Sequence, residues 1–196
     1  SRRKLDLLPA SSVYTDTETI YLPPEISLFK EKTKNFLAYK LIASFQWGLI
    51  AVGTFGFQPG PGHSVVQLLL ERYGRAWREE EPPLSAFFNL FPEPQLASDL
   101  LLMVESLRVS TFLQEELPGL MREAKLVFDR LHQQRPDLKT LQGKALLVEA
   151  LQQWLLTGQT KGKLPTKEQG LYQQAVHLVQ PALAPGDSSE ETAALV

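Results

Sequence analysis

The feature that most constrains the fold of this chain is the apolar stretch over residues 35–57, NFLAYKLIASFQWGLIAVGTFGF, in which Lys40 is the only charged residue. Read as a helix, it is apolar on nearly every face, which is typical of a helix inside a core or a membrane. Its uncharged part, 41–57, is at the short limit of the roughly 20 residues that a bilayer requires. It also contains polar and small residues, and no second such segment follows. We therefore expect a central core helix that begins within 31–35 and ends before Gly53.

Composition excludes several functional classes. The chain has 196 residues, 43% of them hydrophobic, enough for one large domain or two small ones. Its formal net charge of −2 gives no general electrostatic reason to bind nucleic acid or an anionic membrane. The absence of cysteine excludes disulfides, thiolate catalysis and cysteine-ligated zinc, and it is consistent with a reducing, cytoplasmic location.

Hydrophobic periodicity and proline or glycine punctuation predict further helices after the central one. They are expected over 63–80, 84–91, 94–116, 118–134, 138–157 and 166–180. Thr166 and Gln169 have the spacing of a capping box at the start of the last helix. The fold class is therefore predicted to be all-α, a single domain of six or seven helices around the central apolar helix.

The ends of the chain differ in composition from this helical domain, which is placed at 25–183. Residues 1–24 carry few helix signals, and VYTDTETIYL over 13–22 favours a single extended strand within an N-terminal arm. Residues 184–196 are polar and acidic and are expected to form a linker. The chain lacks an initiator Met, so we expect it to be a piece of a longer protein.

No motif for catalysis stands out in the sequence. His63, His132 and His177 lie singly on different predicted helices and are expected to be surface or capping residues. There is no H-E-x-x-H, no G-x-S-x-G and no phosphate-binding loop. Glu105 lies on an apolar helix face with Arg108 one turn later, which suits either a structural ion pair or a catalytic carboxylate.

A mixed-charge segment is the other candidate site. Arg72, Arg75, Trp77 and Arg78 lie within ERYGRAWREEE at 71–81. Such a run is commonly a solvated helix face, but an aromatic residue among arginines is also a composition found at protein interfaces. These four residues are therefore candidates for a partner contact.

Several segments, taken in order, resemble one protein family. They are YLPPEISLF at 21–29, NFLAYKL and GTF in the central stretch, NLFPEPQLASDLLLMVESLRV at 89–109, LPGLMREAKLV at 117–127 and ALLVEALQQWLLTG at 145–158. This ordered set is similar to the N-terminal domain that precedes the von Willebrand factor A module in NorD- and CbbO-type proteins. Trp47, in place of a small residue, favours the CbbO type.

The resemblance implies a non-catalytic, chaperone-like adaptor that binds a hexameric MoxR-type AAA+ ATPase. ATP and Mg²⁺ would be used by that ATPase, and no cofactor is expected in this chain. The client would be inhibited Rubisco, engaged through a C-terminal von Willebrand module, as in a CbbO-type Rubisco activase subunit. The alternative client is nitric oxide reductase, as for the NorD type, or another metalloenzyme. Neither a nucleic-acid partner nor a membrane span is expected.

This chain departs from the family at one place. Many relatives carry residues resembling H-[EQ]-x-x-H just before the G-[TS]-F motif, with the glutamate of E-D-x-R as a further potential zinc ligand. Here Phe45 and Leu49 occupy the imidazole positions and Ser106 replaces the aspartate, whereas Glu105 and Arg108 remain. Because phenylalanine and leucine cannot bind zinc, the resemblance implies a lost metallopeptidase-like site. A degenerate or residual zinc hydrolase is the less favoured alternative.

Overall fold

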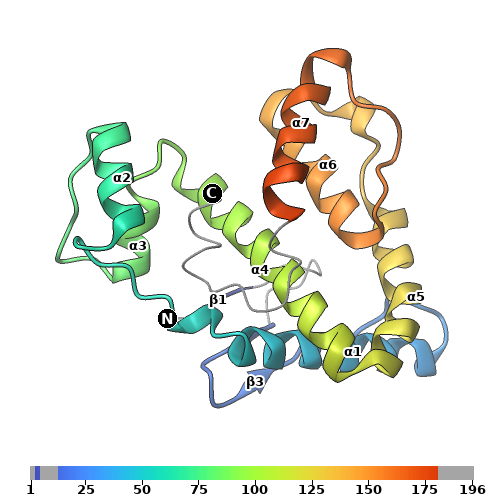
Figure 1. Cartoon of the computed structure of the whole chain (residues 1–196). Coiled ribbons are helices and arrows are strands. Elements are labelled where there is room, and N and C mark those ends of the chain that lie inside the picture. Colours follow the sequence, from blue (N-terminus) through green and yellow to red (C-terminus); the bar gives the residue numbers. More distant parts are fainter. Residues whose placement is uncertain (1–2, 5–12, 181–196) are drawn as a thin grey trace.

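The computed structural model describes residues 3–4 and 13–180, and helices make up most of this part (Figure 1). The α-helices are α1 (Lys32–Ala51), α2 (Ser64–Tyr73), α3 (Pro83–Phe88), α4 (Pro94–Glu116), α5 (Pro118–Gln134), α6 (Gly143–Thr157) and α7 (Thr166–Val179). The 3₁₀-helices are η1 (Thr54–Gly56) and η2 (Leu138–Thr140). The predicted all-α class is confirmed, with seven α-helices in the described part of the chain.

The apolar stretch forms α1, which is the core helix that the sequence predicts. Leu37, Leu41, Phe45 and Leu49 are buried and pack against α4 and α5. The helix stops where Gly53 adopts a φ of 76°, a left-handed conformation that costs glycine little. Among the described helices, none is long and apolar enough to cross a membrane.

Helix α4 joins the parts of the fold. In Figure 1 it crosses the middle of the molecule, between α2 and α3 on one side and α6 and α7 on the other. It contacts α1, α3, α5 and α6, and it supplies residues to two of the three hydrophobic clusters formed by the described residues. The third cluster consists of Leu138 of η2, Leu146 and Ala150 of α6, and Leu164.

Within the N-terminal arm, residues 14–21 form a hairpin, so the prediction of a single strand over 13–22 is wrong. Strands β1 (Arg3–Lys4), β2 (Tyr14–Thr15) and β3 (Ile20–Tyr21) form an antiparallel sheet in that order, with Tyr14 opposite Tyr21. The chain reverses because Asp16 Oδ1 accepts hydrogen bonds from the backbone N–H of Glu18 at 3.1 Å and of Thr19 at 2.7 Å. An aspartate that bonds the backbone two and three residues ahead is a turn former.

Several helix boundaries also differ from the predictions. The helix predicted over 84–91 is α3, which begins at Pro83 and ends at Phe88. The second helix ends at Tyr73 instead of residue 80, because Gly74 takes a φ of 61° and closes it. Helix α6 begins at Gly143, after η2, and not at 138. The cap of α7 is Pro165 and makes no side-chain hydrogen bond, so the predicted Thr166 capping box is wrong. The predicted linker at 184–196 lies outside the described residues.

Candidate functional site

A buried polar cluster lies where α4 passes the C-terminal end of α1. Glu105 is 1% exposed and Arg108 is 7% exposed. Arg108 Nη1 donates to Glu105 Oε1 at 2.7 Å and to Oε2 at 2.8 Å. The hydroxyl of Thr54 donates to Glu105 Oε2. The structural ion pair that the sequence suggested is therefore present, and it reaches η1 as well.

The local fold explains why these groups meet. Gly53 reverses the chain after α1, which brings Thr54 in η1 back onto α4. Arg108 Nη2 donates to the carbonyl of Val52 at 3.1 Å, just after the last turn of α1. The terminal carbonyls of a helix lack partners within the helix, and a cation placed there also complements the helix dipole. The cluster thus fastens the end of α1 and the following turn to α4.

The two positions where the resemblance places imidazoles are core positions. Phe45 and Leu49 are each 2% exposed and belong to the main hydrophobic cluster. The Phe45 ring packs edge-on against Phe128 of α5, with 6.2 Å between ring centroids. Neither side chain offers a lone pair, and both Glu105 oxygens already accept hydrogen bonds, so these residues do not fit a zinc ion. Over residues 3–4 and 13–180, no group of three or more His, Asp or Glu side chains could hold a metal ion.

Of the mixed-charge candidates, Arg72 lies in the last turn of α2 and the other three lie in the loop after it, where they have structural contacts. Arg75 Nη1 donates to the carbonyl of Asn89, at the end of α3, at 2.8 Å. Arg78 Nη1 donates to Glu81 Oε1 at 2.8 Å, and this bond is the main reason that the pKa of Glu81 lies below its ordinary value. Trp77 packs on the cluster formed by α2 and α3.

The fourth candidate, Arg72, is exposed and lies over the ring of Tyr73, 5.6 Å from its centroid. The sequence suggested one surface made of Arg72, Arg75, Trp77 and Arg78. In the structure, Arg75 and Trp77 hold the loop after α2 against α3, and Arg78 pairs with Glu81 within that loop. A partner contact at these residues stays a prediction.

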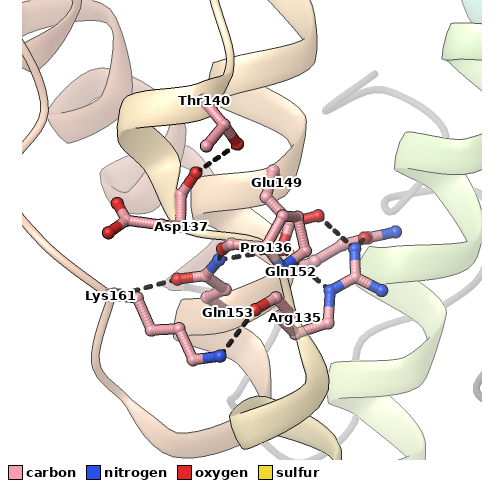
Figure 2. A network of polar contacts seen from close by, with 8 residues as sticks. All are labelled: Arg135, Pro136, Asp137, Thr140, Glu149, Gln152, Gln153 and Lys161. Carbon is pink, nitrogen blue, oxygen red and sulfur yellow. Dashed lines mark hydrogen bonds and ion pairs between the residues drawn. The ribbon is translucent and has the colours of Figure 1, made fainter.

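A second polar network, which the sequence did not indicate, joins α5 to α6 (Figure 2). Gln153 is completely buried; its Nε2 donates to the Pro136 carbonyl and to Glu149 Oε1, both at 2.8 Å. Its Oε1 accepts from the backbone N–H of Lys161 at 2.7 Å. Arg135 Nε donates to Glu149 Oε1 at 2.8 Å. The network holds the end of α5 and the loop after α6 to one side chain, which is a structural role.

The fold and these clusters define an all-α domain in which buried charged groups belong to polar networks that connect neighbouring helices. No family model, curated protein or solved structure matches the chain. The family resemblance and what it implies therefore stand as a proposal.

Proposed function

We propose that this chain is a non-catalytic adaptor domain that binds a MoxR-type AAA+ hexamer and couples its ATP hydrolysis to the remodelling of a client protein. The proposal starts from the ordered resemblance of the segments between residues 21 and 158 to NorD- and CbbO-type proteins. In this view the chain supplies binding surfaces, and the ATPase supplies the chemistry with ATP and Mg²⁺.

The proposal that the domain is non-catalytic rests on the residues at the junction between α1 and α4. Phe45 and Leu49 fill hydrophobic core at the positions where a zinc-binding helix needs imidazoles. Glu105 is held by Arg108 and Thr54, deep below the surface. A catalytic carboxylate must reach its substrate, whereas a carboxylate held in this way joins helices. These contacts favour a scaffolding role for the domain over a hydrolase activity.

Inhibited Rubisco is the favoured client, reached through a von Willebrand module outside this chain, and the site of action would be the cytoplasm. Nitric oxide reductase, or another metalloenzyme, is the alternative client. The two differ in what the ATPase complex restores, so the client can be assigned by an activity assay.

The test uses the purified chain, its MoxR-type ATPase, and the longer protein that carries the module. We expect the chain to co-purify with the hexamer at a fixed stoichiometry. We also expect the longer protein with ATP to restore carboxylation by inhibited Rubisco. Binding without rescue would assign another client. A folded chain that fails to bind the ATPase, or that contains stoichiometric zinc, would contradict the adaptor proposal.

A further inference from the structure

The outward side of α1 carries apolar groups that the core does not use. Phe36, Lys40, Ala43 and Trp47 follow one another at intervals of four, three and four residues, so they lie along one side of the helix. We call these four residues the α1 stripe. The Phe36 side chain is 60% exposed and that of Trp47 is 41% exposed. The opposite side of α1 packs on α4 and α5.

Each aromatic side chain of the stripe contacts one neighbour, and that of Trp47 is packed against another helix. The Trp47 ring lies against Phe112 of α4, with 5.1 Å between centroids and 51° between ring planes. The Lys40 ammonium lies over the Phe36 ring, 5.0 Å from its centroid. Rings already positioned in the free protein lose little conformational entropy on binding, and tryptophan is enriched among the residues that dominate interface energies.

The charge near the stripe is uneven along the helix. Residues 30–40 contain four lysines, Lys30, Lys32, Lys34 and Lys40, and one glutamate. That glutamate, Glu31, pairs with Lys34 at 2.8 Å. Residues 41–57 carry no charge. Of these lysines, Lys32 and Lys40 lie four residues before and after Phe36 and share its side of α1. The stripe is therefore basic near Phe36 and uncharged near Trp47, over a length of about 16 Å at 1.5 Å per residue.

We propose that the α1 stripe is the docking site for an amphipathic, acidic helix of the partner protein. Its apolar face would cover Phe36 and Trp47, and its carboxylates would lie beside the lysines at the start of α1. This arrangement matches charge to charge and apolar surface to apolar surface over the whole stripe. The inference rests on the proposed adaptor function, since it assigns the surface with which the adaptor binds its ATPase.

An anionic membrane is a different partner for exposed aromatic and basic side chains. One observation favours a protein. The uncharged end of the stripe, around Trp47, lacks the basic residues that border the apolar face of a membrane-surface helix.

The experiment measures the affinity of the whole chain for the MoxR-type ATPase hexamer and, separately, for phosphatidylserine vesicles. The stripe variants are Phe36→Ala, Trp47→Ala and Lys40→Glu. The matched controls are Leu171→Ala, at an α7 side chain that is 58% exposed, and Lys167→Glu, at an exposed lysine of α7. Circular dichroism and thermal unfolding verify that every variant is folded.

We expect each stripe variant to weaken ATPase binding at least about tenfold and the controls to change it less than about twofold. Added salt should weaken wild-type binding, and Lys40→Glu should reduce that salt dependence. Equal binding by wild type and stripe variants would overturn the docking site and leave the adaptor function intact. No binding by the wild type would overturn both proposals. Stripe-dependent binding to vesicles but not to the ATPase would assign the stripe to a membrane.

Discussion

Glu105 and Arg108 show how a charged pair is accommodated in a helical core. Both lie on α4; Glu105 also accepts a hydrogen bond from Thr54 of η1, and Arg108 also donates to the Val52 carbonyl at the end of α1. Replacing both members of such a pair often changes the free energy of unfolding little. Replacing only one leaves a buried charge without its counter-ion, which is destabilising. The stability of the domain therefore depends more on keeping the pair matched than on its being charged.

The first prediction follows from this asymmetry. Arg108→Met should lower the free energy of unfolding by about 3–5 kcal/mol, because the Glu105 carboxylate keeps its burial and loses the guanidinium. The double variant Glu105→Gln with Arg108→Met should lose clearly less free energy of unfolding than Arg108→Met alone. Urea unfolding followed by circular dichroism measures both. A double variant that is less stable than Arg108→Met would show that the pair is not the source of the effect.

Gly48 is the residue that allows α1 and α4 to approach closely. A Cβ atom added there would lie 2.6 Å from Cγ1 of Val109, which is itself completely buried. Valine is stiff at χ1 and cannot swing away from the contact. The small residue at position 48 therefore sets the distance between the two helices at this crossing.

We predict that Gly48→Ala lowers the free energy of unfolding. Overpacking costs about 1–3 kcal/mol, which exceeds the gain of about 1 kcal/mol from alanine's helix propensity. Adding Val109→Ala should restore part of the loss. The control is Gly170→Ala in α7, where a Cβ meets nothing within 4 Å and the variant should be neutral or stabilising. Thermal unfolding compares all four proteins, and a Gly48→Ala variant as stable as Gly170→Ala would contradict the close approach.

Among the elements, the β2–β3 hairpin depends on one charged side chain. Hydrogen bonds to Asp16, above all the one from the Thr19 N–H, hold the pKa of Asp16 below its ordinary value. A group whose pKa is lowered on folding contributes stability above its unfolded pKa, and this contribution is lost as the pH falls through its folded pKa. The turn should therefore loosen only at acid pH.

The third prediction is local to this turn. As the pH falls below about 4, the Thr19 amide proton should shift in NMR spectra because its acceptor is protonated. In Asp16→Asn the side chain cannot titrate, and the same amide should stay constant over this range. A wild-type Thr19 amide that is insensitive between about pH 6 and pH 2 would contradict the observed turn.

The junction of α5 and α6 depends on Gln153 in a similar way. Gln153→Leu keeps the approximate volume but removes the partners of the Pro136 carbonyl and the Lys161 N–H. Both hydrogen bonds are part-buried, and each lost bond costs about 0.5–1.5 kcal/mol, so the free energy of unfolding should fall by roughly 1–3 kcal/mol. Gln159→Leu, at an exposed position in the following loop, is the control and should have little effect. Chemical denaturation of the two variants side by side measures the difference.

At the level of elements, strong hydrophobic periodicity was sufficient to predict the long helices. Local signals for turns and helix ends were not sufficient to predict the hairpin or the end of the second helix. The bounds of α1, α4 and α5 followed from the apolar stretch and from Pro94 and Pro118 at helix starts. The extension of the second helix to 80 was wrong because a glycine inside a helical pattern can either be tolerated or end the helix. The hairpin was missed because Asp16 and Thr19 stand in a run rich in β-forming threonine and tyrosine.

For the whole molecule, the sequence could predict an ion pair but not the junction around it. Glu105 and Arg108 are one helical turn apart, so their pairing is a local property of α4. Their contacts with Thr54 and Val52 depend on how α1 and α4 cross, which no local pattern records. The Gln153 network was missed for the same reason, since a glutamine on an amphipathic helix is ordinarily expected to face solvent.

Helix α4 connects the parts of the described fold, because it contacts α1 and α5 in the main core and also α3 and α6. A surface such as the α1 stripe is thus carried on a helix fixed to the centre of the fold, and not on a loose segment. Such a rigid arrangement suits a domain that positions a partner, which is what an adaptor requires.

The measurement that tests the central claim most directly is the ATPase rate of the MoxR-type hexamer as this chain is added. The adaptor account predicts that the rate changes with added chain and saturates at a fixed ratio of chain to hexamer, while the chain alone hydrolyses no ATP. A rate that stays constant at every concentration of a folded chain, with no complex formed, would contradict the account.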